Sequence, residues 1–141
     1  LLCCLIFSSC EKPSKDNTED KIHEVCSLMA EPLKFSSETI TVKGNIMGYH
    51  HLILYGDNCK EPEKGVNIIF DLKTQNKFIE MAKQLKGREK RDGNYYLGIT
   101  IKGLFNKIPD ETFNNVNDPL SNPKIQYEMV VDSIIEIHPI L

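Results

Sequence analysis

Two short segments of this chain read almost alike: ITVKGNI at residues 40–46 and ITIKGLF at residues 99–105. In each segment apolar side chains alternate with Thr or Lys until the alternation reaches a glycine. Such alternation predicts a strand with one buried face. Because Gly44 and Gly103 fall in the inward register, we expect them where the backbone of a curved sheet bends or crowds. The two segments are therefore predicted to be strands that meet in one small β-barrel.

Five strands are expected in all, over residues 38–46, 51–55, 66–72, 95–106 and 125–137, and the last has a break near Ser133. Residues 91–94 read as a turn before the fourth strand. The alternation also predicts which side chains point inward. The inward set is Ile40, Val42, Ile46, Val66, Ile68, Phe70, Leu72, Leu97, Ile99, Ile101, Phe105, Ile125, Tyr127, Met129, Val131, Ile135 and Ile137.

Two helices are expected beside these strands. After the third strand the apolar period changes to about 3.6, with Thr74 as the N-cap and Gly87 closing the helix. Its apolar stripe consists of Phe78, Met81, Ala82 and Leu85. A shorter helix is expected from Asp20 to about Glu31, just before Pro32. Its stripe consists of Ile22, Val25, Cys26 and Met29.

The order strand, strand, strand, helix, strand, strand resembles the OB-fold, which carries Val-x-Val-x-Gly-like segments in its first and fourth strands. The resemblance covers residues 38–137 and implies a mainly β protein with some α structure. Its core would be a five-stranded OB-fold-like closed barrel, here preceded by a short N-terminal helix. A β-sandwich or an SH3-like barrel is the alternative, although neither would naturally place a three-turn helix after the third strand.

The first ten residues, LLCCLIFSSC, carry no charge and are followed by the polar stretch EKPSKDNTED. They are too short to span a bilayer, which takes about 20 residues, but they fit the second half of a secretory signal sequence. Phe7-Ser8-Ser9-Cys10 resembles the lipobox of bacterial lipoproteins, which implies lipid attachment at Cys10. We therefore expect a partial lipoprotein signal peptide at 1–9, a flexible tether at 10–20 and a single domain at 21–141. A frayed hydrophobic start of a cytosolic protein is the alternative.

A lipid anchor would hold the domain at the bacterial cell envelope, on a periplasmic or surface face, without spanning the membrane. In that oxidising compartment Cys26 and Cys59 can pair, while buried free thiols are the alternative. The chain also resembles small exported bacterial proteins with a short helix before such a barrel and a Cys after its second strand. The matching residues here are Val25-Cys26-Ser27-Leu28 and Cys59, and this resemblance implies no particular activity.

No catalytic constellation is present in the sequence. Neither a Gly-x-Ser-x-Gly motif nor a Gly-rich phosphate loop before a helix occurs. The pair His50-His51 is adjacent, and adjacent residues on a strand point to opposite faces, so at most one could join Asp57 or Cys59 at a metal. We expect no enzyme, no cofactor and no metal site, with an ordinary polar turn at the two histidines.

OB-folds usually bind through the face of strands two and three and through the loops joining strands one to two and four to five. We expect ligand contacts in the corresponding places here, because Tyr and His can stack on sugars or bases and Asn offers paired donors and acceptors. The alternative is that these aromatic residues are parts of the core or anchors of loops. The predicted ligand-binding residues are Tyr49, His50, His51, Tyr55, Asn67, Phe113, Asn114 and Asn115.

These observations together predict a membrane-anchored lipoprotein that acts as a non-catalytic binding module for an envelope protein, peptide or glycan. The first alternative is a single-stranded nucleic-acid-binding protein, which the fold class permits. Export and the net charge of −3 argue against nucleic acid as a partner. A metal-binding protein is the second and weaker alternative.

Overall fold

The computed structural model describes residues 21–57, 59, 65–85, 90–109 and 125–140. They form a mainly β protein with two α-helices. In chain order the elements are β1 (Ile22–Glu24), α3 (Val25–Ala30), the 3-10 helix η1 (Pro32–Lys34), β2 (Glu38–Gly48), β3 (Leu52–Tyr55), β4 (Val66–Phe70), α4 (Leu72–Lys83), β5 (Lys90–Arg91), β6 (Asn94–Lys107) and β7 (Tyr127–Pro139).

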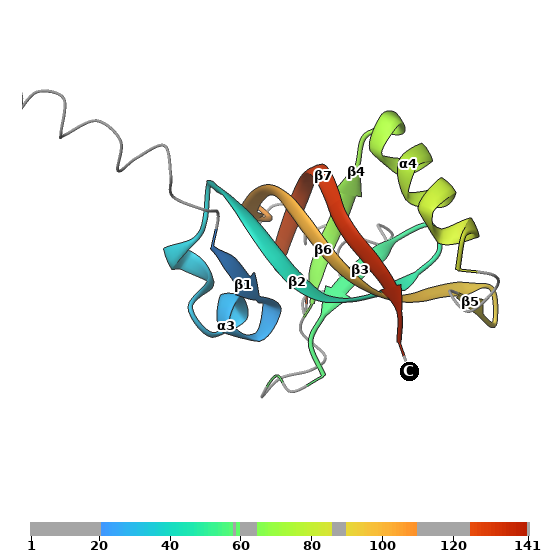
Figure 1. Ribbon diagram of the computed structural model, residues 1–141. Coiled ribbons are helices and arrows are strands. Elements are labelled where there is room, and N and C mark those ends of the chain that lie inside the picture. The colour runs from blue at the N-terminus through green and yellow to red at the C-terminus, as the bar shows by residue number, and fades with distance from the viewer. Residues whose placement is uncertain (1–20, 58, 60–64, 86–89, 110–124, 141) are drawn as a thin grey trace, which may run out of the picture.

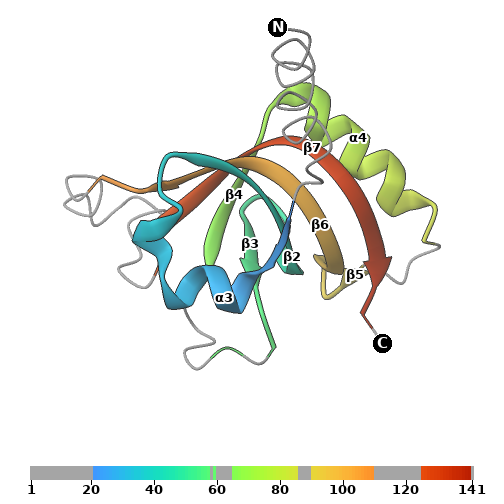
Figure 2. The ribbon, with the colours of Figure 1, turned by 60° about the vertical axis from the view of Figure 1, so that its left-hand side comes forward.

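The strands form one seven-stranded sheet in the order β1-β2-β3-β4-β7-β6-β5, and β2 also pairs with β6. The β2–β6 pairing is antiparallel and runs from Glu38 opposite Phe105 to Gly48 opposite Tyr95. The two similar segments therefore lie side by side, which confirms that they are neighbouring strands. β7 pairs antiparallel with β6 and parallel with β4, so each of β2, β3, β4, β7 and β6 pairs with two others of these five strands. Figure 2 shows the strong curvature of β2, β6 and β7.

Two of the seven strands were not predicted. β1 pairs in parallel with residues 41–43 of β2, and this pairing replaces the first turn of the helix predicted over residues 20–31. The helix α3 is correspondingly shorter and begins at Val25. β5 pairs with the start of β6 across a tight turn at Asp92 and Gly93, both with positive φ, which confirms the predicted turn. The sheet is thus larger than the five strands expected from the sequence.

Most of the predicted inward side chains are buried. They pack into one core with Leu28, Leu52, Leu54, Phe78 and Ala82, and Phe70 and Ile137 are partly buried against it. Two predictions were wrong: Leu72 is 74% exposed at the start of α4, and Ile135 is 54% exposed. In β7 the register with β6 shifts on either side of Ser133, so that Ile134 rather than Ile135 faces the core. The predicted break in this strand lies at these shifts.

The glycines that end the two similar segments lie where other atoms approach closely. A Cβ on Gly103 would collide with the backbone carbonyl of Val130 in β7. A Cβ on Gly44 would lie 2.9 Å from the Tyr55 carbonyl oxygen and 2.9 Å from a methyl carbon of Val25. Both glycines therefore serve the crowding role predicted for them.

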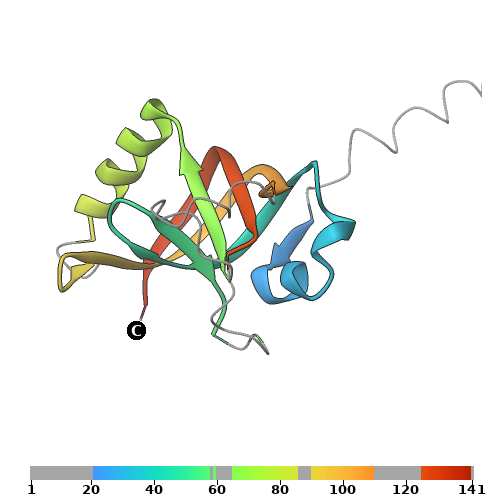
Figure 3. The ribbon, with the colours of Figure 1, turned by 180° about the vertical axis from the view of Figure 1, so that it is seen from behind.

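The helix α4 begins one turn earlier than predicted. Asp71, not Thr74, is its N-cap, and the Thr74 backbone N–H donates a hydrogen bond of 2.7 Å to Asp71 Oδ1. α4 packs against β4 and β7 and buries Phe78 and Ala82. Figures 1 and 3 show that α4 and the segment formed by β1 and α3 lie at opposite ends of the curved sheet.

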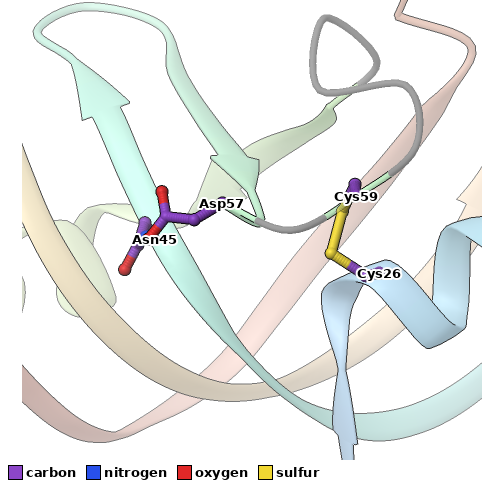
Figure 4. The surroundings of a disulfide bond; sticks show 4 residues. All are labelled: Cys26, Asn45, Asp57 and Cys59. Carbon is purple, nitrogen blue, oxygen red and sulfur yellow. A yellow bond between two sulfur atoms is a disulfide. The ribbon is translucent and has the colours of Figure 1, made fainter.

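A disulfide joins Cys26 of α3 to Cys59, with 4.9 Å between the two Cα atoms (Figure 4). Beside it, the amide nitrogen of Asn45 donates a hydrogen bond of 2.9 Å to Asp57 Oδ2. The disulfide ties the segment that precedes β2 to the chain that leaves β3. Val25 and Leu28, which flank Cys26 on α3, are buried in the core.

Candidate functional site

A cavity of about 700 Å³ lies at the end of the sheet where α4 packs. Its walls come from the 49–51 turn, residues 67–70 of β4, the inner side of α4 and the β5–β6 hairpin. β3 begins at Leu52, opposite Ile68, so Ile69 and Phe70 of the antiparallel β4 extend beyond the first residue of β3. The cavity occupies the space left by this difference in strand length. Its volume falls in the range usual for small-molecule sites. We call it the β4–α4 cavity.

A run of aromatic rings forms much of the cavity wall. Phe70 contacts Phe78 with 5.4 Å between ring centroids, and Phe78 contacts Tyr95 edge-on at 5.1 Å. Tyr95 lies nearly parallel to Tyr49 at 6.2 Å, and Tyr49 contacts His50 at 4.5 Å. The exposed fraction rises from 2% at Phe78 to 52% at Tyr49. The rings therefore form a continuous surface from the core to the solvent.

Two lysines line the same cavity. The Lys90 ammonium lies 4.9 Å from the centroid of the Tyr95 ring and 5.7 Å from that of Tyr49, both within cation–π range. Lys83 lines the cavity from the last turn of α4. No Asp or Glu occurs among the described residues that line it. Its described wall thus combines apolar side chains with two cations.

Four of the predicted ligand-binding residues line the cavity: Tyr49, His50, His51 and Asn67. Asn67 is only 4% exposed, so it supplies a buried amide to the wall. Tyr55 does not line the cavity, and Phe113, Asn114 and Asn115 lie outside the described residues.

Tyr55 belongs to a different part of the surface. It pairs with Asn45 across β2 and β3, at the far end of the hairpin from the 49–51 turn. Burial raises the pKa of the Tyr55 phenol, and the charges of Asp57 and Tyr96 raise it further while Arg91 lowers it. The Asn45 amide and the Asp57 carboxylate point toward one another here (Figure 4). Tyr55 is therefore separate from the group formed by Tyr49 and the two histidines.

The two loops predicted to share a binding surface begin at opposite ends of the sheet. The 49–51 turn follows Gly48, which pairs with Tyr95 at the start of β6. The other loop leaves from the far end of β6, where Lys107 pairs with Tyr127 and the Ile108 N–H donates to the Gln126 carbonyl oxygen at 2.8 Å. The described ends of this second loop therefore do not adjoin the turn.

Sequence reasoning missed several cavity residues. Phe78 was read as part of the core stripe of a helix, and Tyr95 as the start of a strand. Lys83 and Lys90 belong to the stretch from Lys73 to Asp92, whose excess of basic residues is visible in the sequence. That excess was the available signal. The sequence alone does not show that α4 packs beside the 49–51 turn, so it could not place these lysines next to that turn.

The described residues hold no group of three or more His, Cys, Asp and Glu side chains that could bind a metal ion. Cys59, which the metal hypothesis invoked, is bonded to Cys26. In the structure its sulfur is therefore not a free thiolate ligand. This weakens the metal-binding alternative.

Comparison with known proteins adds no functional assignment. No protein family, no curated protein and no solved structure matches the chain. Among the residues that the structure describes, no helix has both the length and the apolar character needed to cross a membrane.

Proposed function

We propose that this chain is a non-catalytic binding protein of the bacterial cell envelope, held at the membrane by a lipid on Cys10. Its ligand would occupy the β4–α4 cavity. The observation that carries the proposal is this cavity, into which four of the predicted contact residues converge. The ligand would be an envelope component, either a protein, peptide or glycan as the sequence predicts, or a smaller molecule of the cavity's size.

We further propose that β2, β3, β4, β7 and β6 form an OB-fold-like barrel. Support comes from the strand pairings, since each of these five strands pairs with two others of the five, and the β2–β6 pairing joins the first of them to the last. α4 lies between the third and fourth of them in the chain, as in the OB-fold resemblance. β1 and β5 are additions to this arrangement. A barrel of this kind would present the 49–51 turn as one of its binding loops.

The envelope location is supported by the uncharged start of the chain and the lipobox-like Phe7-Ser8-Ser9-Cys10. The Cys26–Cys59 disulfide is compatible with an oxidising compartment. Metabolic labelling with an alkyne fatty acid tests the anchor. We expect label on the wild-type protein and none on Cys10→Ala, and an unlabelled wild-type protein would contradict lipid attachment.

The binding role is tested by crosslinking in living cells. A photoreactive amino acid in place of Tyr49, at the cavity mouth, should form an adduct with the ligand or partner. The matched control is the same amino acid in place of Lys73, which is exposed on α4 outside the cavity. Adducts from position 49 alone support the proposal. No adduct from position 49, or equal adducts from both positions, would refute it.

Single-stranded nucleic acid remains the alternative ligand because the near-parallel rings of Tyr49 and Tyr95 lie beneath the Lys90 ammonium. Bases stack on aromatic rings, and lysines contact phosphates. The net charge of −3 disfavours such binding. An oligonucleotide titration decides the point, since binding that weakens steeply with added salt would favour nucleic acid.

A further inference from the structure

We infer that the β4–α4 cavity selects a small organic anion that carries an apolar or aromatic body, in preference to a neutral molecule of the same shape. This inference rests on the proposed function, in which the cavity is the ligand site. It goes further by naming the chemistry of the ligand.

The charge of the described wall has one sign. Lys83 and Lys90 line the cavity, and no Asp or Glu lies among its described lining residues. The whole chain carries a net charge of −3, so this positive wall is a local departure from the charge of the protein. Clefts lined by one sign of charge concentrate ligands of the opposite sign. A carboxylate or sulfonate is therefore favoured over a neutral or cationic group.

The wall also contains a group of apolar side chains. Ile68 and Phe78 are 7% and 2% exposed, and Ile69 and Ile79 add further aliphatic surface. A ligand body placed against these side chains would remove apolar surface from water, which is favourable by about 25 cal/mol per Å². Tyr95 and Phe70 add ring faces and edges suited to flat ligands. The buried amide of Asn67 offers one hydrogen-bonding group beside them.

The lysines and the apolar side chains lie at different depths in the cavity. Lys83 and Lys90 are exposed, as is Tyr49, whereas Phe78 and Tyr95 are buried. The cations therefore lie toward the solvent and the apolar wall lies toward the core. An amphipathic anion matches this order, with its charged head at the lysines and its body directed toward Phe78. A small inorganic anion would leave the apolar wall unfilled.

Three pyrene derivatives with the same ring system provide the test: pyrenebutyrate, pyrenebutanol and pyrenemethylammonium. Each would be titrated into the folded wild-type protein and followed by pyrene fluorescence. We expect pyrenebutyrate to bind roughly tenfold more tightly than pyrenebutanol, because each exposed charge contact adds a modest amount and there are two. Pyrenemethylammonium should bind most weakly. Added salt should reduce the preference for the anion.

The variant Lys83→Gln/Lys90→Gln should remove most of this preference, because it should weaken pyrenebutyrate binding much more than pyrenebutanol binding. The control, Lys73→Gln/Lys77→Gln, changes the net charge by the same amount on exposed positions of α4 outside the cavity. It should retain the preference. Equal loss in both double variants would mean that overall charge, not the cavity, selects the anion, and would overturn the inference.

The outcomes separate this inference from the proposed function. If pyrenebutyrate and pyrenebutanol bind equally well, the anion inference is wrong and the cavity remains a ligand site. If no derivative binds, the anion inference is again wrong, and the crosslinking experiment at Tyr49 decides the proposed function by itself. Only a preference for the anion that disappears with Lys83 and Lys90 supports the inference.

Discussion

Cys26 and Cys59, which lie 33 positions apart in the sequence, are joined by a disulfide that connects α3 to the chain beyond β3. A crosslink of this length lowers the conformational entropy of the unfolded chain. It also holds β1 and α3 on β2, where Val25 and Leu28 enter the core. The N-terminal segment of the fold is therefore stabilised by a covalent link as well as by packing.

The first prediction concerns this bond. Cys26→Ser/Cys59→Ser should lower the free energy of unfolding by about 3–4 kcal/mol, from the loop-closure entropy of a crosslink of this span. Urea unfolding followed by circular dichroism measures the change. Treating the wild-type protein with a reductant should give a similar loss and should not affect the double variant. A wild-type midpoint that is insensitive to reductant would show that the bond contributes no stability.

The second prediction concerns the crowding at Gly103. Gly103→Ala should lower the free energy of unfolding by about 1–3 kcal/mol, because the added Cβ would collide with the Val130 carbonyl and push β7 away. The control is Gly93→Asn, where nothing lies within 4 Å of an added Cβ and Asn tolerates the positive φ. It should cost less than about 1 kcal/mol. Equal losses in the two variants would contradict the crowding argument.

The third prediction concerns the cavity floor. Phe78→Ala should lower the free energy of unfolding by about 3–5 kcal/mol, because Phe78 is 2% exposed and contacts two other rings. Leu72→Ala on the same helix is the matched control. Leu72 is 74% exposed, so its truncation should change stability by no more than about 0.5 kcal/mol. A small effect at Phe78 would mean that α4 is not packed on the sheet as described.

The fourth prediction concerns the N-cap of α4. The hydrogen bond from the Thr74 N–H lowers the pKa of the Asp71 carboxyl below its ordinary value of 3.8. The charged form is thus favoured in the folded state. Its contribution to stability is fully present above pH 3.8, and it is lost as the pH falls through the lower pKa of the folded state.

Asp71→Asn removes the carboxylate charge but keeps the N-cap hydrogen bond, since Asn also accepts a hydrogen bond at this position. Wild type should be more stable than Asp71→Asn above pH 3.8, and the difference should shrink as the pH falls further. Asp71→Ala should be less stable than wild type even in acid. Urea midpoints across the acid range test this, and a difference between wild type and Asp71→Asn that does not change with pH would contradict it.

The buried faces of the strands were predictable from the sequence because alternation is a local property. Val42 and Ile101 sit in unbroken alternating runs and are both fully buried, opposite each other. The prediction for Ile135 was wrong because the register shift before Ser133 moves the inward position to Ile134, and the shift after Ser133 restores the predicted face at Ile137. β1 was missed because three residues become a strand only through pairing with β2.

The candidate site was harder to predict than the fold. Tyr49, His50 and His51 are adjacent in sequence, so composition was enough to single them out. Lys90 and Phe78 join them only because α4 packs beside β4 and the β5–β6 hairpin folds back. Tyr55 was placed with them because it lies on the same hairpin, but it belongs to the other end of that hairpin. A short stretch of sequence does not show which end of the hairpin faces the cavity.

The position of β7 has a consequence for how the chain acquires its structure. β7 pairs with both β4 and β6, yet it is the last described strand to be synthesised. Contacts between such distant parts of a chain form slowly, because a long loop must close before they provide any stabilisation. Until residues 127–139 emerge, Ile101 and Phe105 lack the strand that covers them. Such a delay would leave apolar surface of the nascent chain exposed to chaperones and proteases until its last described strand has been made.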